Sequence, residues 1–206
     1  MNSFISKHFW LLFLIIIPVT VFDFLTADLF SGTGLYTLGN IGLFAANMIY
    51  GIILIKLSSQ YHYYKISGIC YIVSVLLTVW LQLMGVTEFG VAFGSIVLSS
   101  FRTILNAVAV YYELSTHSDI ISREDYEMST KWAKLTTYYV FSYVLLLISI
   151  ISVSFIPIIS FIIIMVASFS ILILGIMKFI YLYRTAKIFR RLAKEENVSR
   201  ETSSIN

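Results

Sequence analysis

Runs of about twenty apolar residues recur along this 206-residue chain and limit what it can fold into. A membrane-spanning helix needs about 20 consecutive apolar residues to cross a hydrocarbon core about 30 Å thick. A helix is suited to this environment because it satisfies its backbone hydrogen bonds internally, without water. Only 12% of the residues are charged, whereas a soluble domain carries roughly a quarter. We therefore expect an all-α, polytopic membrane protein without a separate aqueous domain.

Six apolar runs predict six transmembrane helices packed in one bundle. They lie near residues 9–27, 35–57, 66–84, 90–112, 134–156 and 158–182. The segment 113–134 is the only sizeable loop that this pattern predicts, because the other links are short. We expect a six-helix transmembrane domain over residues 1–182, followed by a basic cytoplasmic helix and a disordered tail over 183–206.

The basic residues indicate how these spans are oriented. Every Lys and Arg except Arg102 falls in the N-terminal segment, in or beside the second or fourth link, or at or after the end of the last span. These parts share one side of a membrane if the number of spans is even. Because cytoplasmic loops carry an excess of Lys and Arg, we predict a multi-pass protein of the cell membrane with both termini in the cytoplasm.

The predicted loop at 113–134 contains a second helix signal. Ser122, with Asp125 three residues later, resembles the start of a helix. Tyr126, Ser129 and Trp132 then share one face. We interpret this segment as a short amphipathic helix at the cytoplasmic interface that leads into the fifth span. A solvated connector whose aromatic side chains anchor at the lipid headgroups is the alternative.

The end of the chain is basic and indicates which partners to expect. Each Lys or Arg near an anionic membrane surface contributes about 1 kcal/mol of attraction, so we expect membrane lipids, including anionic lipid at the basic tail, as partners. The 113–134 loop and the C-terminal helix also offer surfaces to a protein partner. The net charge of +3 is spread over membrane-flanking segments, so nucleic acid is not an expected partner.

Polar residues in the fourth span follow a helical spacing. Two sets occur at seven-residue steps: Glu88, Ser95 and Arg102, and then Ser99, Asn106 and Glu113. Steps of three, four and seven residues stay on one face of an α-helix. This span therefore carries a polar stripe with an arginine near its middle. An ionisable residue inside a membrane span is a functional-site hypothesis by default.

Arg102 lies about eleven residues from the outer end of its span, which is about 16 Å deep in a hydrocarbon core about 30 Å thick. Inserting it costs about 2.5–3.5 kcal/mol. The nearest acidic residues lie close to the membrane surfaces, with Asp23 about 6 Å deep and Glu113 at the inner edge. Two interpretations remain open. Arg102 snorkels outward to an ion pair with Asp23, or it faces a wet cavity and holds a polar or anionic ligand.

The leading functional hypothesis is a small membrane protein that binds or transports a polar or anionic ligand. The candidate ligand-binding residues are Arg102, Asn106, Asn47, Ser99, Asp23 and Tyr143. Asp23 would gate this site from outside. The rival hypothesis is an accessory or regulatory subunit of a larger membrane complex, without a ligand of its own.

A membrane-embedded enzyme at the cytoplasmic edge is a weaker alternative. It would require His62, Cys70 and Glu113 to converge within hydrogen-bond reach. Glu113 and His117 are spaced to share a metal, but we interpret them as a solvated pair in the loop. The only cysteine is Cys70, so no intrachain disulfide forms, and the sequence predicts no catalytic residue, cofactor or metal site.

Overall fold

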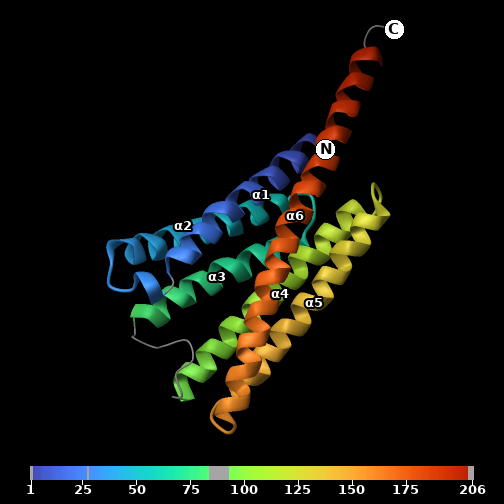
Figure 1. The fold of residues 1–206 in the computed structure, drawn as a ribbon. Helices are drawn as coiled ribbons and strands as arrows, with labels where there is room; N and C mark the ends of the chain where they lie inside the picture. The colour runs from blue at the N-terminus through green and yellow to red at the C-terminus, as the bar shows by residue number, and fades with distance from the viewer. Residues whose placement is uncertain (1, 27, 84–92, 204–206) are drawn as a thin grey trace. The chain divides into compact units, whose positions relative to one another are not determined.

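The computed structural model describes residues 2–26, 28–83 and 93–203, and these residues form helices joined by short connections. Six α-helices and one short 3-10 helix follow one another in this part of the chain (Figure 1). They are α1 (Asn2–Leu25), η1 (Asp28–Phe30), α2 (Gly34–Leu57), α3 (Tyr63–Leu83), α4 (Phe93–Ile121), α5 (Tyr126–Ser152) and α6 (Pro157–Ser203). The all-α prediction is confirmed for these residues.

Five of the described helices are long and apolar enough to cross a membrane. They are α1, α2, the segment Tyr63–Leu81 of α3, α5, and the segment Pro157–Glu196 of α6. The predicted span at 90–112 begins outside the described residues, and α4 is not one of the five. The link predicted between the third and fourth spans, with Glu88, also lies outside the described residues. The chain is thus a helical protein with several candidate membrane spans.

Helix boundaries follow from local sequence where capping residues occur. α6 begins at Pro157, whose fixed φ and missing N–H suit the first position of a helix. α5 begins after Asp125, whose carboxylate accepts a hydrogen bond from the Met128 backbone N–H at 2.9 Å. Gly32 ends the η1 turn with a φ of 77°, a conformation that glycine adopts without strain.

The predicted loop at 113–134 is wrong. Residues up to Ile121 belong to α4, and residues from Tyr126 belong to α5, so the connection is only residues 122–125. Polarity suggested a loop because Glu113 and several residues after it are hydrophilic, but Glu113, Thr116 and His117 are buried by packing. The amphipathic segment predicted from Ser122 is continuous with α5, and Asp125 rather than Ser122 is the N-cap.

The chain divides into two compact units, Met1–Ala46 with Lys178–Asn206, and Asn47–Met177. In the first unit, aromatic rings join α1 to the C-terminal part of α6. Phe9 stacks on Phe189 with ring centroids 5.6 Å apart, and Phe13 stacks on Phe179 at 4.6 Å. α1 also approaches α2 closely, because a Cβ added at Gly39 would lie 2.8 Å from Leu25.

α6 continues without a break through the boundary predicted at residues 182 and 183. The structure assigns residues 199–203 of the predicted tail to this helix, and residues 204–206 lie outside the described part. The division into a transmembrane domain and a basic cytoplasmic segment stays a prediction.

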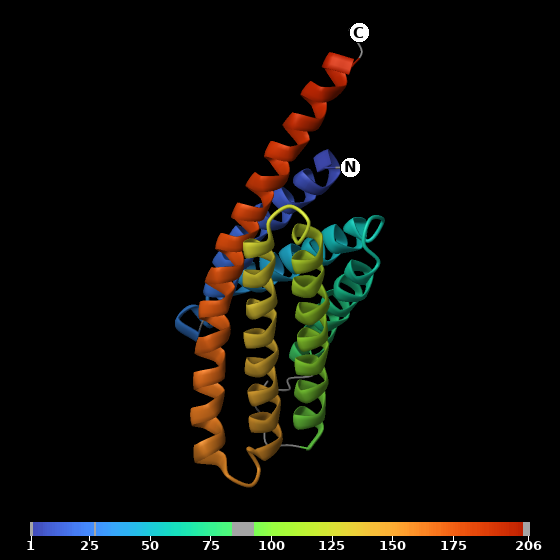
Figure 2. The same ribbon diagram turned by 90° about the vertical axis from the view of Figure 1, so that its right-hand side faces the viewer.

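In the second unit, α4 packs against both α3 and α5, and the three helices lie side by side (Figures 1 and 2). α2 meets α3 at a pair of glycines. A Cβ added at Gly68 would lie 2.6 Å from the Gly51 carbonyl oxygen, so only glycine permits this approach. At the other end, the Ser152 and Ser160 hydroxyls join α5 to the first turn of α6 at 2.8 Å. Of these neighbours, α3 and α5 pack directly on α4.

Candidate functional site

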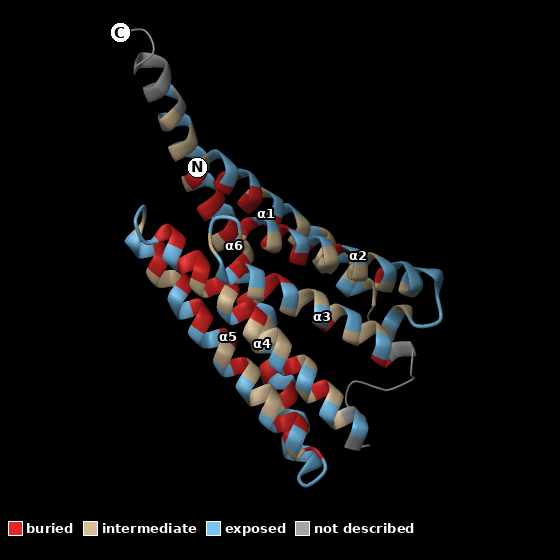
Figure 3. Cartoon of the chain, turned by 180° about the vertical axis from the view of Figure 1, so that it is seen from behind, coloured by how far each residue is buried: buried red, intermediate tan, exposed pale blue. Residues whose placement is uncertain are grey.

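The polar stripe predicted from sequence faces the interior of the Asn47–Met177 unit. Ser99 is buried, Arg102 and Asn106 are half-buried, and Glu113 is fully buried, whereas Val97, Phe101 and Ile104 on other faces of α4 are exposed. Along α4 and α5, buried positions alternate with exposed ones, as expected for helices with one face packed against neighbours (Figure 3). The exposed side chains are apolar, as a surface in contact with lipid requires. The side chain of Ser95 lies outside the described residues.

Glu113 is the centre of a buried hydrogen-bonded cluster. Its Oε1 atom accepts a hydrogen bond from the Tyr50 hydroxyl of α2, and its Oε2 atom accepts one from the Tyr71 hydroxyl of α3 at 2.9 Å. The rings of Tyr50 and Tyr71 meet edge to face, with centroids 5.4 Å apart. Two donors on two oxygens fit an ionised carboxylate, which accepts hydrogen bonds and donates none. The arrangement of the cluster therefore suits an ionised Glu113.

His117 lies one helical turn beyond Glu113 and is equally buried. Its Nε2 atom is 3.4 Å from Glu113 Oε1, and its Nδ1 atom is 2.5 Å from the Tyr64 hydroxyl oxygen. The imidazole ring packs edge-on against Trp132 of α5, at a centroid distance of 4.8 Å. The Tyr64 hydroxyl satisfies Nδ1, and Nε2 faces the Glu113 carboxylate without a hydrogen bond to it.

The interpretation of Glu113 and His117 as a solvated loop pair is wrong, since both side chains are 0% exposed. The sequence contained a signal for this. The spacing of Ser99, Asn106 and Glu113 continues on the same face to His117 and then to Ile121, which is also fully buried. Because Glu113 and His117 are polar, they were assigned to a loop, although the helical spacing continues through them.

α3 is attached to α4 by two further hydrogen bonds along the same face. The Ser74 hydroxyl donates to Asn106 Oδ1 at 2.7 Å, and the Ser67 hydroxyl donates to the Ala109 carbonyl oxygen at 2.7 Å. The Oδ1 atom of Asn106 is therefore engaged in a contact between α3 and α4. Such contacts are the usual role of serine and asparagine between membrane helices.

Arg102 and Tyr143 lie within electrostatic range of each other, and Tyr143 is also within range of Glu113. Tyr139, one turn before Tyr143 on α5, stacks on it with centroids 6.4 Å apart and lies within electrostatic range of Glu113. The two tyrosines of α5 thus interact electrostatically with charged residues of α4. Sequence analysis selected Tyr143 but not Tyr139.

Five of the six predicted ligand-binding residues belong to the Asn47–Met177 unit: Asn47, Ser99, Arg102, Asn106 and Tyr143. Among these, the structure brings Arg102 and Tyr143 into electrostatic range, and Asn47 is half-buried on α2. Asp23 is exposed on α1 and belongs to the other compact unit, so its predicted gating role stays a prediction. Sequence reasoning did not select Tyr50, Tyr64, Tyr71, Tyr139 or Trp132 for this site, and it interpreted Glu113 and His117 as solvated.

No group of three His, Cys, Asp or Glu side chains in the described part of the chain is arranged to hold a metal ion. His62 is exposed in the link between α2 and α3, Cys70 is half-buried on α3, and Glu113 is engaged by tyrosines. An exposed His62 and a fully buried Glu113 do not favour the convergence that the enzyme hypothesis requires.

The helices and the buried polar face define a helical protein suited to a membrane. Comparison with models of known protein families, with curated proteins and with solved structures finds no match for this chain.

Proposed function

We propose that this protein is a multi-pass protein of the cell membrane that binds or transports a polar or anionic ligand beside α4, with Arg102 as the anion-binding residue. The proposal includes six spans, with α4 as the fourth, and both termini in the cytoplasm. The distribution of basic residues supports this orientation, because Arg102 is the only Lys or Arg that does not fall on the predicted cytoplasmic side.

The observation that carries the proposal is the inward-facing polar stripe of α4. From Ser99 to His117 it extends about 27 Å at about 1.5 Å per residue, which approaches the thickness of a bilayer core. Hydrogen bonds between membrane helices contribute about 0.6 kcal/mol each on average, whereas placing a charged residue at mid-bilayer costs about 2.5–3.5 kcal/mol. As packing alone, Arg102 would destabilise the bundle by more than such bonds stabilise it, which favours a functional role for this residue.

The chemistry of the stripe fits an anionic ligand. A guanidinium offers a planar set of N–H donors that matches a carboxylate or phosphate group, and Tyr143 supplies a neighbouring hydroxyl. Farther along the same face, Glu113 and His117 form a carboxylate–imidazole pair of the kind that relays protons in membrane pumps and transporters. One helix face thus offers an anion-binding group and a proton acceptor.

Cysteine accessibility tests whether water and anions reach this face. In a Cys70→Ala background, Ser99→Cys and Thr103→Cys place thiols on the polar face, and Val97→Cys and Ile104→Cys place them at similar depth on the exposed apolar faces. Each variant is reconstituted in liposomes and treated with an anionic or a cationic methanethiosulfonate. These reagents react with thiols that are exposed to water.

We expect labelling at positions 99 and 103 only, and faster reaction with the anionic reagent. Arg102→Gln should abolish the preference for the anionic reagent, and Arg102→Lys should retain it. If positions 99 and 103 are as unreactive as the two lipid-facing controls, the face is dry. The proposal then fails in favour of an accessory subunit without a ligand.

A further inference from the structure

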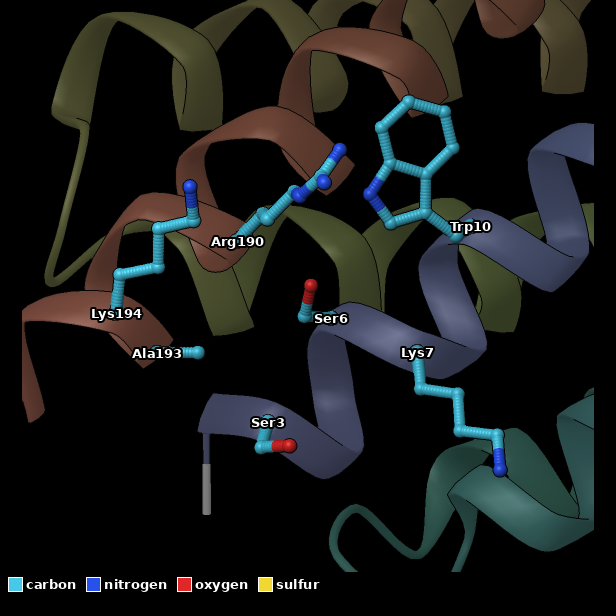
Figure 4. A pocket seen from close by; sticks show the side chains of 7 residues that line it. All are labelled: Ser3, Ser6, Lys7, Trp10, Arg190, Ala193 and Lys194. Atoms are coloured by element: carbon cyan, nitrogen blue, oxygen red, sulfur yellow. The ribbon is translucent and has the colours of Figure 1, made fainter. Parts of the chain in front are cut away.

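An open groove lies in the Met1–Ala46 and Lys178–Asn206 unit, between the start of α1 and the C-terminal part of α6. Its volume is about 470 Å³ (Figure 4). α1 contributes Ser3, Ser6, Lys7 and Trp10, and α6 contributes Arg190, Ala193 and Lys194. This groove belongs to neither the α4 stripe nor the Glu113 cluster, and it is independent of the function proposed above.

The groove collects positive charge that protein side chains do not balance. Among the described residues, no carboxylate forms an ion pair with Lys7, Arg190 or Lys194. The neighbouring Arg191 differs, because its Nε atom is 3.7 Å from Glu195 Oε1. Three cations from two helices around one concave surface attract an anion.

Trp10 adds a directed hydrogen-bond donor to this charge. Its indole Nε1 atom is buried and has no hydrogen-bond partner in the described part of the chain. Figure 4 shows this nitrogen turned toward the side on which Ser6 and the Arg190 guanidinium lie. A buried N–H without an acceptor is costly, and an anion oxygen in the groove would satisfy it.

The faces that form the groove continue as apolar surface. Ser3, Lys7 and Trp10 share a face of α1 with Leu14 and Ile17, which are 52% and 46% exposed. A ligand with a charged group in the groove could therefore extend a hydrocarbon chain along the exposed side chains of α1. Tryptophan and basic residues are also typical of the boundary between lipid and water.

We propose that this groove binds the phosphate group of an anionic phospholipid headgroup, held by Arg190, Lys194 and the Trp10 indole N–H, with Lys7 at its edge. The acyl chains lie against the exposed apolar face of α1. This assigns a discrete lipid site, in place of the diffuse attraction that the basic tail alone would exert. Under the predicted topology, the site lies at the cytoplasmic surface of the membrane.

The test uses the full chain in a neutral detergent, with lipid binding measured by native mass spectrometry. Phosphatidylglycerol is titrated against the wild type, the Arg190→Gln/Lys194→Gln pair and the charge-matched control pair Arg184→Gln/Lys187→Gln. The control residues are exposed on the same helix but do not line the groove. Phosphatidylcholine serves as the uncharged-headgroup control, and inorganic phosphate serves as the soluble source of the same chemistry.

We expect the groove pair to weaken phosphatidylglycerol binding by at least about tenfold, since each basic residue near a membrane surface is worth roughly fivefold. The control pair should retain most of the affinity. Trp10→Phe should also weaken binding, whereas Trp80→Phe, which alters an exposed indole outside the groove, should not. Circular dichroism of each variant verifies that the helices are retained.

Equal weakening by the two charge-matched pairs would overturn the proposal, because it would show diffuse attraction instead of a site. Inorganic phosphate that displaces the lipid at comparable concentration would show that the ligand is a soluble phosphate compound, and would overturn the assignment to lipid. Equal binding of phosphatidylcholine and phosphatidylglycerol would also contradict it, since the unpaired cations should favour a net negative headgroup.

Discussion

Removal of one hydroxyl from the Glu113 cluster tests the energetic argument most sharply. The Tyr50 hydroxyl donates to Glu113 Oε1, and the two side chains are 4% and 0% exposed. Tyr50→Phe removes the donor and changes little else. A hydrogen bond to a charged group contributes about 1.5–3 kcal/mol, whereas hydrogen bonds between membrane helices average about 0.6 kcal/mol. We expect the free energy of unfolding to fall by about 1.5–3 kcal/mol.

The assay is reversible unfolding in mixed micelles of increasing SDS fraction, followed by circular dichroism. Tyr138→Phe is the matched control, because its side chain is 55% exposed on α5 and forms no hydrogen bond in the described part of the chain. Its effect should stay within about 0.5 kcal/mol. If Tyr50→Phe is no more destabilising than Tyr138→Phe, Glu113 is not a buried charge that depends on its tyrosine donors.

The Tyr71→Phe variant extends this test to the other carboxylate oxygen. Because Tyr50 and Tyr71 share one acceptor, the double variant should be non-additive, with a coupling energy of about 0.5–3 kcal/mol. Additive losses would show that the two hydroxyls act independently of Glu113.

Three further predictions use the same unfolding assay. Gly68→Ala should cost about 1–3 kcal/mol, because the new Cβ would lie 2.6 Å from a backbone oxygen of α2. Gly94→Ala, where nothing lies within 4 Å of the new Cβ, should be neutral or stabilising, and equal losses would contradict the close approach. Asp125→Ala should cost about 0.5–2 kcal/mol by removing the N-cap of α5, whereas Asp125→Asn should cost less, and the reverse order would exclude capping. Ser74→Ala should cost up to about 1.7 kcal/mol through its bond to Asn106, and an unchanged stability would place that bond outside the packing.

The sequence predicted the positions of helices well and their ends less well. The span predicted at 35–57 corresponds to α2 at Gly34–Leu57, whereas the spans predicted at 134–156 and 158–182 are separated by residues 153–156 rather than by Pro157, which begins α6. α4 and α6, however, continue to Ile121 and Ser203. Hydropathy indicates where a helix leaves lipid, and a helix that is capped or packed against a neighbour continues beyond that point.

The candidate site was accessible to sequence reasoning only along a single helix. Spacing within the fourth span predicted which side of α4 carries polar residues, and burial follows that spacing through Ser99 and Glu113. The partners of Glu113 and His117 come from α2, α3 and α5, and include Tyr64 and Trp132. Nothing in the spacing along one helix indicates which residues of other helices will face it, so this cluster required the structure.

We propose that Arg102 holds a polar or anionic ligand inside the helix bundle. It is tested most directly by identifying the small molecules that remain bound to the purified protein, with native mass spectrometry of the wild type, Arg102→Gln and Arg102→Lys. We expect a polar or anionic compound on the wild type, retained by Arg102→Lys and lost from a folded Arg102→Gln variant. The same bound compounds on all three proteins, or none on the wild type, would contradict it.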